Sequence, residues 1–166
     1  MVIVLMGVTG SGKTTIGRQL ATTLGWRYFD ADDFHPSANI EKMSNGQPLN
    51  DTDRLPWLET LRALVRESLK RNEDSVLACS ALKRSYRDYL LLDERVKLVY
   101  LKGDRQLIQS RLQQRQGHYM EPALLDSQFD ILEEPGPETQ IDITARPEEI
   151  VKTIAERFKV LDGRAH

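Results

Sequence analysis

Residues 7–14 read Gly-Val-Thr-Gly-Ser-Gly-Lys-Thr and directly follow a short apolar run, Val2–Met6. The pattern G-x-x-x-x-G-K-[S/T] places glycines where backbone N–H groups must wrap a polyphosphate, a lysine that reaches its outer phosphates and a hydroxyl for Mg²⁺. Ile16, Leu20 and Leu24 follow at helical spacing, so the phosphates would meet a helix N-terminus. An ordinary glycine-rich turn is the alternative, but this order favours a P-loop that binds ATP. The predicted nucleotide site comprises Gly7, Val8, Thr9, Gly10, Ser11, Gly12, Lys13 and Thr14.

The charge balance and the cysteine count limit which binding partners and which cellular compartment are expected for this chain. Charged residues make up 29% of the chain and the net charge is -2, so neither a nucleic-acid footprint nor an acidic tail is expected. The only cysteine, Cys79, excludes an internal disulfide framework and suits a reducing cytosol. No apolar run approaches the roughly 18 residues of a membrane span, and no basic leader precedes the first strand. We expect a soluble cytoplasmic protein whose 166 residues form a single domain, 1–166.

Apolar β-rich runs alternate with amphipathic helical segments along the chain. This alternation predicts an α/β fold, a parallel five-stranded sheet with helices on both faces and right-handed crossovers. Loop-like clusters fall at 34–49, 114–122 and 133–138. The expected strands are 2–6, 27–29, 76–79, 96–101 and 141–143.

Two carboxylates follow the second strand, at the sheet edge where ligands of open α/β sheets bind. Asp30 and Asp32 lie two positions apart, so in an extended strand end both point to the same side of the sheet. Phosphoryl transfer needs a Mg²⁺ ligand and a group that accepts the proton of an attacking hydroxyl. We assign Asp30, with Thr14, to the metal and Asp32 to the base. The alternative is that this acidic run caps the next segment or faces solvent.

A predicted lid over residues 114–123 follows the fourth strand and its helix. Arg111 and Arg115 lie four positions apart on that helix, so both side chains emerge on one face. Lids in such enzymes exclude water and deliver a cation to the transferring phosphoryl group, so Arg115 is a candidate catalytic residue beside Lys13. Solvated helix charges are the alternative interpretation.

Further polar residues converge on the same edge and suit a substrate with hydroxyl and carboxylate groups. His35 follows the acidic pair, and arginine binds a carboxylate through two parallel hydrogen bonds. Each of these side chains is also compatible with a loop or surface position. The candidate substrate-binding residues are Asp32, His35, Arg54, Lys83 and Arg87.

Two longer blocks carry a resemblance to a known family. His35-Pro36, Asn39–Met43, Pro48–Asp51, Arg54 and Pro56–Leu58 form the first block; Cys79–Lys83 and Tyr86–Asp88 form the second. With Phe29–Asp32, Tyr100–Asp104, Gly117-His118, Gln128-Phe129 and Glu134-Pro135, they cover almost the whole chain. The chain resembles the bacterial gluconate kinase (gluconokinase) family.

That resemblance implies a fold similar to shikimate and adenylate kinases, commonly as a homodimer. It also implies Mg²⁺- and ATP-dependent phosphorylation of D-gluconate to 6-phospho-D-gluconate, which feeds sugar-acid catabolism through the pentose phosphate or Entner–Doudoroff routes. The family's ATP site falls on Gly7–Thr14 and its lid arginines on Arg111 and Arg115, with the turn beside the adenine at Arg146 and Pro147. Ala31 stands where many members have glycine.

Two other functions remain compatible with the residues alone. One is a kinase of the same architecture for another acceptor, such as shikimate or a nucleoside monophosphate. The other is a nucleotide-gated binding protein, whose loop senses ATP without phosphoryl transfer. The acidic pair and the lid arginines favour an enzyme over the binding protein.

Overall fold

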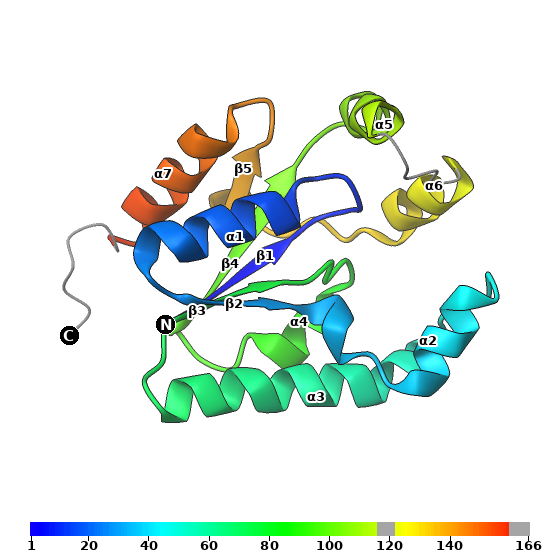
Figure 1. The fold of residues 1–166 in the computed structure, drawn as a ribbon, viewed down its shortest axis with the longest axis horizontal. Coiled ribbons are helices and arrows are strands. Elements are labelled where there is room, and N and C mark those ends of the chain that lie inside the picture. Colours follow the sequence, from blue (N-terminus) through cyan, green and yellow to red (C-terminus); the bar gives the residue numbers. More distant parts are fainter. Residues whose placement is uncertain (116–121, 160–166) are drawn as a thin grey trace.

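The computed structural model describes residues 1–115 and 122–159, arranged as Figure 1 shows. Strands and helices alternate along the chain, as the sequence predicts. The strands are β1 (Val2–Met6), β2 (Arg27–Asp30), β3 (Ser75–Ala78), β4 (Val96–Lys102) and β5 (Gln140–Asp142). The helices are α1 (Lys13–Leu24), α2 (Ser37–Ser44), α3 (Asp51–Lys70), α4 (Arg84–Leu90), α5 (Arg105–Gln114), α6 (Pro122–Ile131) and α7 (Pro147–Arg157), with 3-10 turns at Ala31–Phe34 and Pro137–Thr139.

The five strands form one parallel sheet in the order β2-β3-β1-β4-β5. Strand β1 is central: Val4 lies beside Leu77 of β3 on one side and beside Leu98 of β4 on the other. The chain builds β2 and β3 on one side of β1 and then β4 and β5 on the other. Ligands of open α/β sheets bind at such a switch point, and the phosphate loop leaves the sheet there. The predicted α/β fold with a parallel five-stranded sheet is confirmed.

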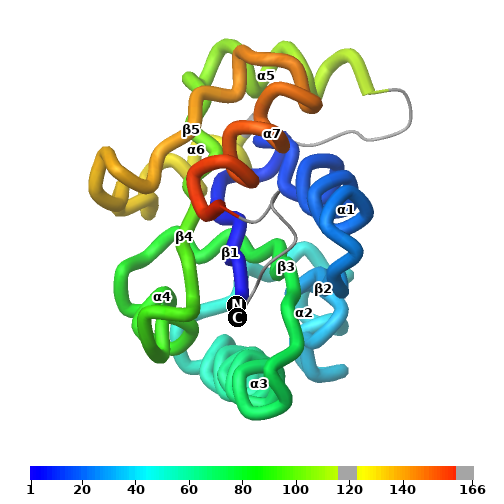
Figure 2. The backbone as a smooth tube through the Cα atoms, turned by 90° about the vertical axis from the view of Figure 1, so that its left-hand side faces the viewer, coloured from blue at the N-terminus to red at the C-terminus, as the bar shows by residue number. Residues whose placement is uncertain are grey.

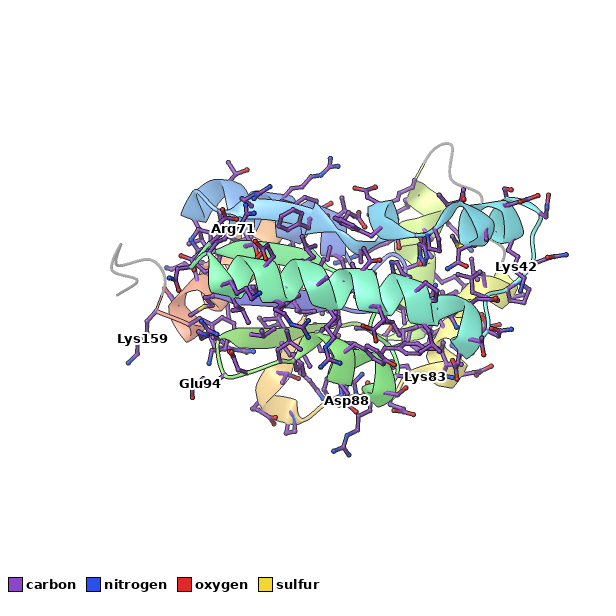
Figure 3. The ribbon with its side chains drawn as sticks, turned by 90° about the horizontal axis from the view of Figure 1, so that it is seen from below. Lys42, Arg71, Lys83, Asp88, Glu94 and Lys159 are labelled. Atoms are coloured by element: carbon purple, nitrogen blue, oxygen red, sulfur yellow. The ribbon has the colours of Figure 1, made fainter. Side chains whose placement is uncertain are left out.

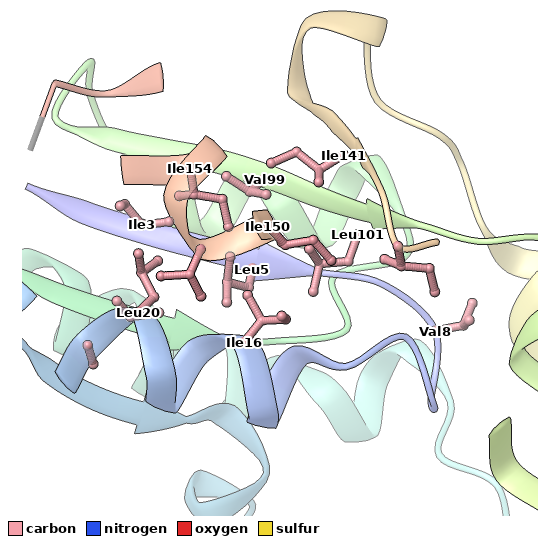
Figure 4. Packing of buried hydrophobic residues seen from close by; sticks show 14 of the residues in the cluster. Ile3, Leu5, Val8, Ile16, Leu20, Val99, Leu101, Ile141, Ile150 and Ile154 are labelled. Carbon is pink, nitrogen blue, oxygen red and sulfur yellow. The ribbon is translucent and has the colours of Figure 1, made fainter. Parts of the chain in front are cut away.

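Helices cover both faces of the sheet, and each face has its own apolar core (Figure 2). Alternate residues of β1 point to opposite faces, so Ile3 and Leu5 pack against α1 and α7 while Val4 packs toward α3. Figure 4 shows the first core, in which α1 and α7 close over β1 and β4. Within the described ranges, no helix is both long and apolar enough to cross a bilayer.

One expected loop contains a helix. The sequence pattern predicts a loop at 34–49, but Ser37–Ser44 form α2, and the element is held by contacts with α3. Asn39 donates to the Asp53 carbonyl at 2.9 Å, and Lys42 pairs with the Asp53 carboxylate at 2.7 Å. Asp53 also completes a capping box with Asn50 at the start of α3. A local pattern does not encode these contacts between helices, so the loop prediction was wrong.

Candidate active site

The phosphate loop joins β1 to α1, and its backbone conformation depends on two glycines. Gly10 has φ 83° and Gly12 φ 99°, in the left-handed region that glycine occupies without steric cost. A Cβ on Gly10 would also lie 2.9 Å from the Leu112 side chain of α5. Within residues 1–115 and 122–159, the N–H groups of Gly10 and Gly12 donate to no protein acceptor. The loop therefore presents unpaired backbone donors beside a helix N-terminus, an arrangement that suits phosphate.

Lys13 and Ser11 add side-chain donors to this loop. Lys13 Nζ donates to the carbonyls of Gly7 at 2.9 Å and Val8 at 3.0 Å. Burial lowers the pKa of Lys13, and the negative charge of Asp32 is the strongest influence that opposes this effect. Ser11 Oγ is buried without a hydrogen-bond partner in the described part of the chain. The buried Ser11 hydroxyl and the Lys13 ammonium join the unpaired backbone N–H groups of the loop, and together these donors suit a polyphosphate ligand.

Helix α6 is bonded directly to the phosphate loop, a contact that sequence reasoning missed. The Thr9 N–H donates to Gln128 Oε1 at 2.7 Å, and Gln128 Nε2 donates to Thr9 Oγ1 at 3.0 Å. In the sequence, the only indication that Gln128 is functional is that the dipeptide Gln128-Phe129 resembles the gluconate kinase family. The Gln128 side chain therefore holds the phosphate loop against α6.

The two carboxylates come together through a turn, not through an extended strand. Strand β2 ends at Asp30, and its Oδ1 accepts a hydrogen bond from the Asp32 N–H at 3.0 Å as the 3-10 turn begins. The expectation that both residues lie in an extended strand end was therefore wrong, although Asp30 does cap the turn. Burial raises the pKa of Asp32, and the negative charge of Asp30 raises it further. A carboxylate with a raised pKa is a stronger proton acceptor.

His35 ends the turn that carries this carboxylate, as its C-cap. Its ring stacks on Trp57 of α3, with centroids 4.4 Å apart, and Asn39 Nδ2 lies 3.4 Å from its Nδ1. Burial lowers the pKa of His35, while the charge of Asp32 raises it. Trp57 in turn donates from Nε1 to the Ala31 carbonyl at 2.7 Å. Trp57 is a buried core residue, and it also fixes the turn that carries Asp32.

Two of the predicted substrate cations meet around one carboxylate. Lys83 Nζ lies 3.0 Å from Asp51 Oδ1, and Arg54 Nη1 lies 4.0 Å from the same atom. Tyr86 connects the group: its hydroxyl donates to Asp51 and accepts from Arg54 Nη1 at 3.1 Å. The hydrogen bonds from Tyr86 and Lys83 hold the pKa of Asp51 below its usual range. Two cations and a phenol that already bind a carboxylate have the chemistry to bind one on a substrate.

Arg87 lies apart from that cluster. Its side chain is buried, and its guanidinium donates to the carbonyls of Ala81 at 2.9 Å, Leu82 at 3.1 Å and Glu133 at 2.9 Å. These bonds fix the loop after β3, in which Ala81 has a positive φ of 45°. The structure thus places Arg87 beneath the loop that carries Lys83.

Arg111 lies in the last turn of α5, but the helix ends at Gln114 and Arg115 follows it with extended backbone, so the prediction that both arginines lie on one helix was wrong. Arg111 Nη2 donates to the Ile143 carbonyl at 2.6 Å, and Arg115 is an exposed residue at the helix C-cap. The charge of Arg115 reaches the phosphate loop, where it lowers the pKa of Lys13. Residues 116–121 of the predicted lid, and His118 with them, lie outside the described residues.

The predicted adenine-side turn opens α7. Pro147 is the first helical residue, and Arg146 Nη2 pairs with Glu149 Oε1 at 3.1 Å. The Arg146 side chain is largely exposed, so its aliphatic portion is accessible to a planar ligand.

Oxygen ligands near the loop suit Mg²⁺. In the part of the chain that the structure describes, no group of three or more His, Cys, Asp or Glu side chains could hold a metal by itself. Mg²⁺ is usually bound by one or two protein oxygens together with substrate phosphates. The Thr14 hydroxyl and the Asp30 carboxylate, beside the phosphate loop, fit that mode.

Cys79 follows β3 and is buried. Burial raises the pKa of its thiol to about 12. Because the thiolate is the reactive form, this side chain is a packing residue at neutral pH.

A phosphate loop at the switch point of a parallel sheet, with carboxylates ending the next strand, defines a P-loop phosphotransferase. The profile of the shikimate kinase family matches residues 9–157. The thermosensitive gluconokinase of Escherichia coli is 49% identical over 82% of this chain and 74% of its own. The gluconokinase of Gluconobacter oxydans is 43% identical over 96% of this chain and 92% of its own. A gluconokinase structure from Sinorhizobium meliloti covers 98% of this chain and 94% of its own, at 39% identity and a TM-score of 0.82. The chain belongs to the gluconokinases within the shikimate kinase family.

Proposed function

We propose that this protein transfers the γ-phosphoryl group of ATP to the terminal hydroxyl of D-gluconate, giving 6-phospho-D-gluconate and ADP. The observation that carries the reaction type is the pairing of two features at the carboxyl edge of the parallel sheet: a phosphate loop with unpaired backbone donors after β1, and the carboxylates of Asp30 and Asp32 in the turn after β2. The gluconokinases at 43% and 49% identity support gluconate as the acceptor.

In this proposal, the phosphate loop and Lys13 hold the outer phosphates, and Arg115 reaches the transferring group from the lid. Thr14 and Asp30 hold Mg²⁺, which when bound neutralises charge on the phosphates. Asp32 accepts the hydroxyl proton as the hydroxyl oxygen bonds to phosphorus and the bond from phosphorus to the bridging oxygen breaks. Because this transfer is loose and rich in charge, positioning and electrostatic stabilisation supply most of the acceleration.

The acceptor is held on the other side of Asp32. Arg54 and Lys83 bind the gluconate carboxylate in place of Asp51, and His35 binds a hydroxyl beside Asp32. Arg111 and the Arg146-Pro147 turn complete the nucleotide side. Arg87 contributes by fixing the loop that carries Lys83, because its own donors are taken by carbonyls.

We place the protein, as a single kinase domain over 1–166, in the cytoplasm as a homodimer. Its product is a phosphorylated sugar acid that enters sugar-acid catabolism.

An acceptor panel tests this function directly. The purified protein with Mg²⁺ and ATP is given D-gluconate, shikimate or AMP, and ADP release is followed by a coupled assay. We expect turnover with gluconate to exceed that with the other acceptors by at least about a hundredfold, because sites that hydrogen-bond a polar substrate reject analogues that leave those groups unpaired. Faster turnover of shikimate would reject gluconate as the acceptor. ATP binding without acceptor-dependent ADP release would reject the kinase itself.

A further inference from the structure

A cavity lies at the end of the sheet opposite the phosphate loop. Its volume is about 520 Å³, and its walls are the C-terminal half of α3 and the segment that joins α4 to β4. Leu69 and Leu92 supply its apolar part. Figure 3 shows Arg71 and Glu94 at this end of the molecule, with Lys42 of α2 and Lys83 of the candidate active site at the other. The cavity is therefore separate from the site described above.

Cations dominate the lining. Arg62, Arg66 and Lys70 follow one another at four-residue intervals, so one face of α3 carries three positive charges. None of the three forms an ion pair within residues 1–115 and 122–159. Arg95 adds a fourth cation from the facing segment, where Asp93, the one carboxylate in the lining, pairs with it at 2.7 Å. The cavity thus has more positive charge than its own residues balance.

This arrangement is unfavourable for the protein alone. Like charges four residues apart on one helix face repel each other and destabilise the helix. Arg62 Nε is in addition buried without a hydrogen-bond partner among the described residues. Buried donors without partners are uncommon in folded proteins, and each one calls for a reason. An anion in the cavity balances the positive charges of Arg62, Arg66, Lys70 and Arg95, of which Asp93 balances only one.

The spacing of the cations defines the class of ligand. Eight residues separate Arg62 from Lys70, so their backbones lie ~12 Å apart along the helix at 1.5 Å per residue. A single phosphate is too small to reach both ends of such a row. Guanidinium groups bind phosphate and carboxylate through paired hydrogen bonds, and the volume is in the ordinary range for small-molecule sites. We infer that this cavity binds a small molecule with two anionic groups, each a phosphate or a carboxylate.

The inference is tested by amide NMR, with the phosphate loop already filled by a non-hydrolysable ATP analogue, Mg²⁺ and gluconate. The probes are inorganic phosphate and glucose 6-phosphate, with one anionic group each, and fructose 1,6-bisphosphate and 6-phosphogluconate, with two. We expect saturable chemical-shift changes of the Asn72, Leu92 and Arg95 amides. The concentration that gives half of the full shift should be about tenfold lower for the probes with two anionic groups than for those with one. The two sugars that carry two anionic groups also distinguish a bisphosphate from a phosphorylated acid as the preferred form. Binding is read without turnover, so the result does not depend on which alcohol the enzyme phosphorylates.

A matched pair of variants assigns the binding to the cavity. Arg66→Gln should weaken binding of the two-anion probes about tenfold, because it removes the central cation of the row. Arg71→Gln removes the same charge from the end of the same helix, outside the cavity, where Arg71 already pairs with Glu67 at 2.7 Å. It should leave binding unchanged, and both variants should melt close to the parent protein.

Three results contradict the inference. The first is the absence of saturable shifts at millimolar probe. The second is equal weakening by Arg66→Gln and Arg71→Gln, which indicates general charge screening. The third is dissociation of an oligomer by Arg66→Gln in sedimentation velocity without any anion binding, which assigns this face to a subunit contact instead.

Discussion

The phosphate loop and the acceptor side of the site are built in different ways. In the loop, Lys13 bonds to carbonyls only five and six positions away, and the donors come from one continuous backbone segment. On the acceptor side, Lys83 and Tyr86 reach Asp51 across 32 and 35 positions, and His35 stacks on Trp57. Phosphate binding therefore depends on local backbone geometry, whereas acceptor recognition depends on how α2, α3 and α4 are packed together.

The largest loss should follow a change within the loop itself. Lys13→Met removes the side-chain charge that stabilises the transferring group, and we expect kcat/KM to fall about a thousandfold. The coupled ADP assay with gluconate measures it. Lys152→Met, on an exposed lysine of α7, is the matched control and should keep parental kinetics. A loss below tenfold in Lys13→Met would show that the loop amides suffice.

Asp32→Asn tests the residue where the two regions meet. Turnover should fall about a hundredfold or more, because the hydroxyl proton loses its acceptor. The folded state of this variant, by contrast, should be more stable than that of the parent at neutral pH. Burial and Asp30 raise the pKa of Asp32 above its usual 3.8, so the folded state holds that proton more tightly and loses stability as pH rises through this interval.

At neutral pH the asparagine variant should therefore melt at a higher temperature than the parent, and the gain should vanish below about pH 4, where both states are protonated. Thermal melts at pH 7 and at the lowest pH at which both proteins stay folded give the comparison. A variant that melts lower at neutral pH contradicts the assigned electrostatics, and one with parental turnover contradicts the base assignment.

Lys83→Met separates acceptor recognition from phosphate binding. We expect KM for gluconate to rise about tenfold with kcat and KM for ATP nearly unchanged, since this cation binds ground state and transition state alike. Lys42→Met is a close control, because Lys42 also pairs with a first-turn aspartate of α3, at 2.7 Å. If Lys83→Met and Lys42→Met change the KM for gluconate equally, Lys83 only holds the helices together and does not bind the acceptor.

The smallest expected effect is on the stability of α3, the helix that carries Asp51 and Arg54 on the acceptor side. Asn50→Ala removes the N-cap of α3 and should lower the free energy of unfolding by ~1 kcal/mol. Urea titration measures this change. Thr153→Ala, which removes a hydroxyl bonded only within α7, should leave stability within about 0.5 kcal/mol of the parent. If the two variants are equally stable, the capping box does not anchor the helix.

The same contrast explains what could be predicted from the sequence. The sheet, the five strands and the phosphate loop follow from motifs and apolar runs that act over a few residues. Helix α2 was missed because Asn39 and Lys42 are held by Asp53 of another helix. The placement of Arg87 under a loop and of Gln128 against Thr9 has the same origin, because each bond joins segments brought together only by the folded sheet. The sequence pattern also could not show that a turn joins Asp30 and Asp32.

The burial of Cys79 has a practical consequence. It is the only cysteine of the chain, and its thiol, with a pKa of about 12, is almost entirely protonated under labelling conditions. Maleimide dyes and spin labels will therefore react with an introduced surface cysteine and leave the native one untouched. Leu124 on α6, with half of its surface exposed, is a suitable position for such a probe. The wild-type chain already serves as the background for fluorescence or electron-spin measurements of motion around bound nucleotide.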